Sequence, residues 1–339
     1  MFLEYTGDRL KKRIGLKITS AGRIDTINAI IPPNGMKGTS CPLHTREVHR
    51  ELDRKGFLNE TFNKVRFVDL LLIYGVLIPL FWIQLRPDSV RRTLVLDYAD
   101  PSLMSVYTTH FVHINWAHLL GNVGGYVLVV SVGYLLSVLS NRRRHFRIVF
   151  VLAMTVVPLC LSVMGLITRN HGIGMGFSGI LMALFAYFSL VLIAFLAVRF
   201  SETLHLDHAF RLFLIGLIFS VLLTTPFGND GTFPVLGLAL LGSALALSLL
   251  RTVSIVSFGS IRRNLRRTGY TELALGSLVL FVFVGFVAFS GGSVGDGSSI
   301  ATDIHAFGFV SGFGLSYVVL RTGCSVSHIR HCARPGSDC

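Results

Sequence analysis

Residues 118–139 read HLLGNVGGYVLVVSVGYLLSVL, and the basic run Asn141-Arg142-Arg143-Arg144 follows almost at once. The stretch contains no Asp, Glu, Lys or Arg. About 20 predominantly apolar residues are enough for a helix to cross the hydrocarbon core of a membrane. Residues 118–139 therefore predict a membrane-spanning helix that ends at a basic loop.

The composition of the whole chain indicates an integral membrane protein with many such helices. Of its 339 residues, 52% are hydrophobic and only 14% are charged, whereas soluble domains carry about 25% charged residues. We predict an all-α, polytopic transmembrane helix bundle with eight spans: 66–84, 118–139, 147–168, 178–199, 212–226, 234–250, 273–290 and 304–320. The fifth and sixth are short and are separated by turn-forming residues, so a re-entrant pair is the alternative to two spans.

The distribution of basic residues predicts the orientation of the chain. With eight spans, all but four of the 31 Lys and Arg residues fall on one side, together with both termini. Cytoplasmic loops carry such an excess of Lys and Arg. We therefore expect a multi-pass protein of the cell membrane with both termini in the cytosol. The same asymmetry accounts for the net charge of +13, so we expect membrane lipid and no nucleic acid as a partner.

Three regions are expected along the chain. Residues 1–65 are polar and basic and predict a cytosolic N-terminal region, either a small appendage or partly disordered. Residues 66–320 hold the spans, and 321–339 form a cytosolic tail. Residues 1–30 lack the continuous apolar core of a signal peptide, so the first span is expected to direct insertion. The Cys and His residues of the tail match no zinc module, and we expect no metal or cofactor.

The first cluster of polar residues lies at the start of the second span. His118 and Asn122 are four residues apart, so they share one face of a helix, and His110 and His113 precede them. Two donors aimed at one point are what an oxyanion hole requires. The alternative is a hydrogen-bonded pair that only holds helices together.

The second cluster opens the fourth span with Gly172-Ile173-Gly174-Met175-Gly176-Phe177-Ser178-Gly179. Glycine permits an irregular, closely packed entry into a helix. The small residues Gly179, Ala183 and Ala186 then follow at helical spacing and predict close contact with another helix. The alternative is that Ser178 is an ordinary small residue of a packing motif.

The third cluster is in the last span, where His305, Gly308 and Gly312 occupy positions i, i+3 and i+7 of one helical face. The glycines leave a smooth groove in which a neighbouring helix can approach the imidazole. If the eight spans alternate in direction, His118, Ser178 and His305 all lie near the same outer face. A serine becomes an effective nucleophile when a histidine accepts its proton.

Together the three clusters resemble the rhomboid family of intramembrane serine proteases. The matching patterns are His-x-x-x-Asn at His118 to Asn122, Gly-x-Ser-Gly at Gly176 to Gly179, and His-x-x-Gly-x-x-x-Gly at His305 to Gly312. The resemblance covers residues from about 66 to 320. It implies a catalytic dyad of Ser178 and His305, oxyanion and supporting roles for His118, Asn122, Gly176, Gly179 and His113, and cleavage of transmembrane protein substrates near the outer face.

The sequence departs from the rhomboid pattern in three respects. About three spans lie between the serine and the histidine helices, where the family has one. Met182 stands four residues after Ser178, where many members carry a Tyr, and the Trp-Arg pair common in the first outside loop is missing from 85–117. A non-catalytic rhomboid-like protein that binds membrane helices is the alternative, but such relatives typically lack Ser or His. A transporter is disfavoured because the sequence shows no internal repeat.

Overall fold

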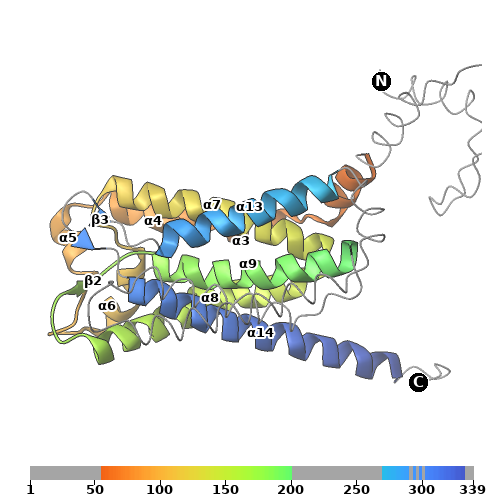
Figure 1. The fold of residues 1–339 in the computed structure, drawn as a ribbon. Helices are drawn as coiled ribbons and strands as arrows, with labels where there is room; N and C mark the ends of the chain where they lie inside the picture. Colours follow the sequence, from red (N-terminus) through yellow and green to blue (C-terminus); the bar gives the residue numbers. More distant parts are fainter. Residues whose placement is uncertain (1–54, 201–268, 290–292, 295–297, 300–301, 333–339) are drawn as a thin grey trace, which may run out of the picture. The chain divides into compact units, whose positions relative to one another are not determined.

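The structure is a computed structural model that describes residues 55–200, 269–289, 293–294, 298–299 and 302–332 (Figure 1). It is a bundle of α-helices with two very short antiparallel sheets. The longer helices are α7 (Trp116–Leu139), α8 (Arg143–Thr168), α9 (Ser178–Arg199), α13 (Tyr270–Phe289) and α14 (Thr302–Cys332). The first apolar segment is divided into α3 (Phe67–Gly75) and α4 (Leu77–Gln84).

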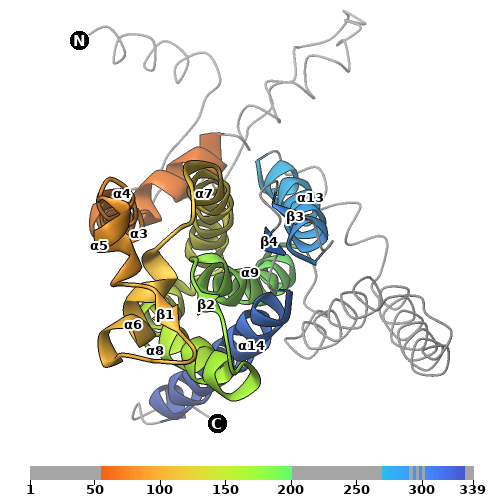
Figure 2. The same ribbon diagram turned by 90° about the vertical axis from the view of Figure 1, so that its left-hand side faces the viewer.

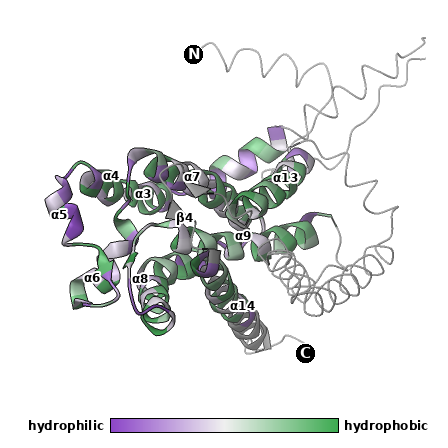
Figure 3. Cartoon of the chain, turned by 60° about the vertical axis from the view of Figure 1, so that its left-hand side comes forward, coloured by the Kyte–Doolittle hydropathy of each residue, from purple (hydrophilic) through white to green (hydrophobic). Residues whose placement is uncertain are grey.

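Six helical segments in the described part of the chain are long and apolar enough to cross a membrane. They are Phe67–Gln84, Trp116–Leu139, Arg143–Thr168, Ser178–Arg199, Tyr270–Ala288 and Asp303–Arg321. Hydrophobic residues make up most of the length of these helices (Figure 3). The expectation of a helical bundle with several helices able to span a membrane is therefore confirmed. The predicted spans 212–226 and 234–250 lie outside the described residues.

Several helices begin earlier than hydropathy predicted, because polar residues also take part in them. Helix α7 starts at Trp116 after the N-cap residue Asn115, whose side-chain oxygen accepts the backbone N–H of His118 at 2.8 Å. Such a cap satisfies an amide that has no partner within the helix. Helix α8 includes its basic N-terminal residues from Arg143, and α14 continues to Cys332, past the predicted span end at 320.

The connection between α4 and α7 is an ordered structure. It consists of α5 (Asp88–Arg92), β1 (Leu96–Asp97), α6 (Leu103–Thr108) and the 3-10 helix η1 (Thr109–Phe111). Strand β1 pairs antiparallel with β2 (Ile173–Gly174), which precedes α9. We call the end of the bundle that carries β1 and β2 the sheet end. The other two strands, β3 (Ser293–Val294) and β4 (Ser298–Ser299), pair with each other.

Helix α9 is the centre of the bundle. Every residue from Gly179 to Phe195 is buried, and α9 contacts α7, α8, α13 and α14 (Figure 2). A helix that is apolar on all sides must be surrounded by other helices or by lipid. In this chain the surrounding helices cover the one that begins with Ser178.

Helices α9 and α14 touch backbone to backbone. A Cβ atom added at Gly308 would overlap the carbonyl oxygen of Gly179, and one added at Gly312 would overlap Ala183. The close contact predicted from these small residues is therefore confirmed. Small residues serve this purpose in membranes because helices there associate through packing rather than through the hydrophobic effect.

Candidate active site

The turn before α9 places Ser178 at the start of that helix. Gly176 has φ +117°, a conformation that residues with a Cβ rarely adopt, and its N–H donates to the Thr109 carbonyl at 3.1 Å. The next residue, Phe177, is fully buried, with its ring against Phe111 and Tyr126. Ser178 itself is partly exposed as the first residue of α9. The glycine turn and the buried ring together hold its backbone.

His118 lies against this turn. A Cβ added at Gly176 would be 3.2 Å from Cε1 and 3.5 Å from Nε2 of His118. A side chain at position 176 would therefore press on the imidazole, which gives Gly176 a second reason to be glycine. The sequence patterns that contain His118 and Ser178 meet at this point.

Asn122 lies one turn further along α7 and is buried. Its Nδ2 donates to the His118 carbonyl at 3.2 Å. In this arrangement the amide bonds within its own helix, so an oxyanion role would require it to turn toward the reacting group.

His113 joins the connection before α7 to the turn before α9. Its ring is fully buried, its Nε2 accepts the N–H of Phe177 at 3.4 Å, and its edge faces the His118 ring at 5.2 Å between centroids. Burial, with a smaller contribution from His118, lowers the pKa of His113 to about 3. The ring is therefore neutral near pH 7 and can accept this bond.

Thr109 is a supporting residue that the sequence patterns did not identify. Its hydroxyl donates to the Gly174 carbonyl and accepts the N–H of Leu96 at 3.1 Å, so it fastens β2 to β1. Its own carbonyl accepts the N–H of Gly176. The sequence signal available was weak, because a threonine in a loop is usually an ordinary surface residue.

His305 is buried near the start of α14, and its Nδ1 lies 2.9 Å from the carbonyl oxygen of Ala288 on α13. A carbonyl can only accept a hydrogen bond, so Nδ1 must carry the proton. Nε2 of a neutral imidazole then keeps its lone pair and is the basic nitrogen. Ala288 thus selects the tautomer that a general base needs.

The residues that follow Ser178 and precede His305 meet where α9 crosses α14. Gly179 follows Ser178, and a Cβ added there would be 3.2 Å from Cγ2 of Ile304, which precedes His305. Within the described part of the chain, the Ser178 hydroxyl makes no hydrogen bond, including none to His305. Catalytic hydrogen bonds often form only when substrate binds.

The carboxylate nearest to His305 in the sequence is engaged elsewhere. One guanidinium nitrogen of Arg169 donates to both oxygens of Asp303, at 2.7 and 2.6 Å. Arg169 belongs to the connection between α8 and α9, so this ion pair joins α14 to that connection. Asp303 is thus committed to Arg169 and, within the described residues, makes no hydrogen bond to the His305 ring.

Among the residues that the structure describes, no group of three His, Cys, Asp or Glu side chains is placed to hold a metal ion. The chain was also compared with known proteins. No protein-family model matches it, and neither a curated protein nor a solved structure does. Functional inference for this chain therefore depends on its own residues and their geometry.

Proposed function

We propose that this chain is an intramembrane serine endopeptidase of the rhomboid type, with Ser178 as the nucleophile and His305 as the base. The observation that carries the proposal is the bond between His305 Nδ1 and Ala288 O, at the crossing where α14 meets the helix that begins with Ser178. This bond leaves Nε2 as the proton acceptor. A buried neutral histidine whose Nε2 keeps its lone pair is suited to be the base, and it lies on a helix packed against the one that begins with Ser178.

In the proposed reaction, His305 Nε2 takes the Ser178 proton as the hydroxyl attacks a peptide carbonyl of the substrate. The imidazolium formed in this step is stabilised by its Nδ1–H bond to Ala288. His118, which lies against Gly176, and Asn122 would supply donors to the oxyanion. His305 would then return the proton to the leaving amine, and water would release the acyl group by the same steps.

The proposed substrates are transmembrane proteins, cleaved near the outer face of the cell membrane. The proposed orientation places the sheet end outside and both termini in the cytosol. Basic residues support this orientation, because they flank the start of α3, the α7–α8 turn and the end of α9: Lys64, Arg66, Arg142, Arg143, Arg144 and Arg199. These helix ends lie opposite the sheet end (Figure 1), and such a pattern is typical of cytoplasmic ends.

The orientation can be tested with single cysteines in intact cells. We expect a membrane-impermeant thiol reagent to modify a cysteine at position 89 or 295 and not one at position 143 or 263. Modification at position 263 from outside would contradict the eight-span topology.

The activity can be tested with a serine-directed fluorophosphonate probe on the full chain in native membranes. We expect labelling of the wild type and none of Ser178→Ala. Ser189→Ala is the matched control, because Ser189 is a buried serine of the same helix whose hydroxyl donates to the Ala186 carbonyl. Equal labelling of Ser178→Ala and Ser189→Ala would contradict the proposal.

A further inference from the structure

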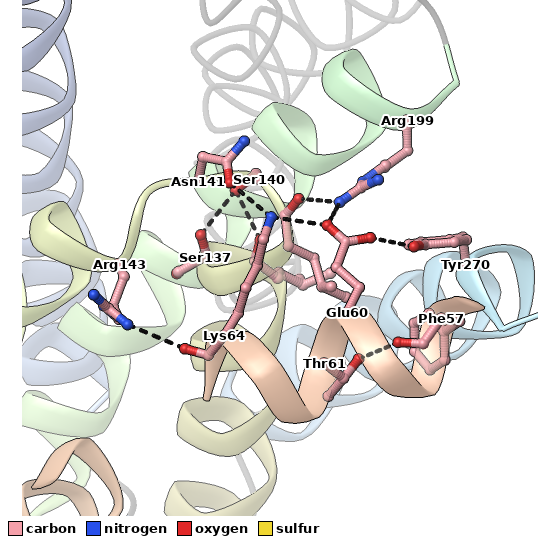
Figure 4. A network of polar contacts seen from close by, with 12 residues as sticks. Phe57, Glu60, Thr61, Lys64, Ser137, Ser140, Asn141, Arg143, Arg199 and Tyr270 are labelled. Carbon is pink, nitrogen blue, oxygen red and sulfur yellow. Dashed lines mark hydrogen bonds and ion pairs between the residues drawn. The ribbon is translucent and has the colours of Figure 1, made fainter. Parts of the chain in front are cut away.

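A cluster of charged side chains joins three helices at the end of the bundle opposite the sheet end (Figure 4). Residues 55–64 are helical, although they belong to the stretch expected to lie outside the transmembrane domain. Their Glu60 carboxylate accepts hydrogen bonds from Lys64 at 2.8 Å, from Arg199 at the end of α9, and from the hydroxyl of Tyr270 at the start of α13.

The cluster is anchored to α7, α8 and α9. Lys64 donates to Asn141 Oδ1 at 2.7 Å in the turn between α7 and α8, and Arg143 donates to the Lys64 carbonyl at 3.1 Å. Arg199 donates to the carbonyl of Leu139, the last residue of α7, at 2.7 Å. Glu60 is therefore held relative to the central helices.

Tyr270 attaches α13 to this anchored cluster. Besides its bond to Glu60, its ring meets Phe57 edge to face with centroids 4.9 Å apart, and the Arg199 guanidinium lies 4.7 Å from its centroid. Gly269, with φ +92°, brings the chain against the Phe57 ring just before the helix begins. One residue thus carries a hydrogen bond, a ring contact and a cation–π contact.

Much of the surface of helix α13 faces outward between its two ends. Apolar side chains that are more than two-fifths exposed lie along most of it: Leu275, Leu278, Val279, Val282, Phe283, Phe286 and Val287. Its inward contacts include the Phe281 ring stacked on Phe185, with centroids 5.3 Å apart. Its inner face packs on the bundle through Ala274 and Val284 as well, so polar contacts fix the two ends and apolar contacts hold the length between them. A continuous helix transmits a displacement of one end to the other.

The other end of α13 carries Ala288, whose carbonyl oxygen accepts the Nδ1–H of His305. Tyr270 and Ala288 are separated by about 27 Å of helix at 1.5 Å per residue. The hydrogen bond to Glu60 and the hydrogen bond to the candidate base are thus at opposite ends of the same helix.

We infer that Tyr270 and Glu60 are positioning residues for His305, acting through α13: the cluster around Glu60 holds the helix at the depth and tilt that keep Ala288 within hydrogen-bond reach of Nδ1. The inference rests on the proposed function for its catalytic consequence. Its mechanical part, the coupling of the two ends of α13, does not depend on catalysis.

The mechanical part can be tested by pulsed electron–electron distance measurements between two spin labels, at Leu120→Cys and Phe286→Cys. The full chain is used, with its five native cysteines replaced, and the protein is reconstituted in lipid vesicles. Both positions are exposed and lie toward the sheet-end halves of α7 and α13. We expect Tyr270→Phe to shift or broaden the distance distribution. Tyr74→Phe is the matched control, because it removes one tyrosine hydroxyl that bonds Ser131 on α7 at 2.8 Å, away from α13.

Glu60→Gln provides a second variant, since it removes the charge that binds Lys64 and Arg199 while keeping the shape of the side chain. We expect the distance distribution to change in the same way. Distributions for both variants that match the wild type and Tyr74→Phe would overturn the inference, whatever the activity of the protein.

The catalytic part uses the same variants without labels, with a transmembrane substrate. We expect Tyr270→Phe to lower kcat about tenfold with little change in KM, because misplacing a catalytic group costs rate rather than binding. Tyr74→Phe should keep the wild-type kcat. A wild type that neither cleaves nor reacts with the fluorophosphonate would contradict the proposed function, while the distance measurement would still decide the coupling. A distance change with unaltered kcat would overturn the positioning role.

Discussion

The start of α9 and the end of the bundle around Glu60 are held in place by different chemistry. At the start of α9, the contacts are backbone amides, glycine packing and the neutral side chains of Thr109 and His113. Around Glu60, they are ion pairs and hydrogen bonds to charge. A buried base must be uncharged before it accepts a proton, whereas charged groups are stable where water or lipid head groups are close. The comparison teaches that, under the proposed function, the candidate reactive groups and the charged anchoring groups lie at opposite ends of the same helices.

The largest expected effect comes from the proposed dyad at the sheet end. Ser178→Ala and His305→Ala should each abolish cleavage of a transmembrane substrate, and the double variant should lose little more. In subtilisin, removal of either the serine or the histidine costs roughly 10⁶-fold in kcat, about as much as removal of the whole triad. Initial rates of the two single variants and the double variant measure this. His171→Ala, at an exposed histidine of the connection before α9, is the control.

The proposed oxyanion donors should have the next largest effect. His118→Ala and Asn122→Ala should each lower kcat by about 100- to 1,000-fold, as the loss of one donor does in a soluble serine protease. Reaction of Ser178 with the fluorophosphonate should persist at least in part, because the dyad is intact. Wild-type turnover in both variants would reduce the two residues to a structural contact between helices.

The two ends should lose stability in different pH ranges. Burial lowers the pKa of His113 to about 3 and that of His110 to about 4, both below the ordinary value of 6.5. Below pH 6.5 the unfolded chain therefore binds protons that the folded chain does not, and stability falls as the pH is lowered toward these values. Between pH 7 and 5 each of the two histidines should lower the free energy of unfolding by about 2 kcal/mol. The midpoint of thermal unfolding in detergent should drop less for His113→Gln than for the wild type over this range.

The contribution of Glu60 to stability should change only at lower pH. Burial alone would raise the pKa of the Glu60 carboxyl, but hydrogen bonds from its three cluster partners lower it to about 2, below the ordinary 4.5. Its stabilising contribution is complete above pH 4.5 and is lost as the pH falls toward 2. Between pH 7 and 5 the midpoint of thermal unfolding of Glu60→Gln should therefore drop by as much as that of the wild type. A smaller drop of the unfolding midpoint in Glu60→Gln than in the wild type over that range would contradict the assignment of the histidines and Glu60 to different pH ranges.

The smallest effect should come from the ion pair at the sheet end. Asp303 binds Arg169, and both side chains are partly exposed. Such pairs contribute about 0–1 kcal/mol, so Asp303→Ala should lower cleavage less than about fivefold. A loss comparable to that of His305→Ala would indicate a catalytic triad and would contradict the dyad.

The amino-acid sequence alone determined where the described apolar helices lie. Hydropathy located all six, because a bilayer requires about 20 apolar residues wherever a helix crosses it. It also determined the closeness of α9 and α14, since glycine and alanine at helical spacing leave no side chain to separate two backbones. Helix ends were less predictable, because caps such as Asn115 are polar and lie outside the hydropathy signal.

Only the tertiary structure decided the contacts between residues far apart in the chain. Glu60 meets Arg199 and Tyr270 across 139 and 210 positions, and no local pattern connects them. The pairing of His305 with Ala288 is equally invisible in the sequence, because every residue has a carbonyl and only the packing of α13 on α14 selects this one. The sequence determined which residues could react, because side-chain chemistry is local. The tertiary structure decided which His305 nitrogen carries the proton, because that depends on a backbone atom of another helix.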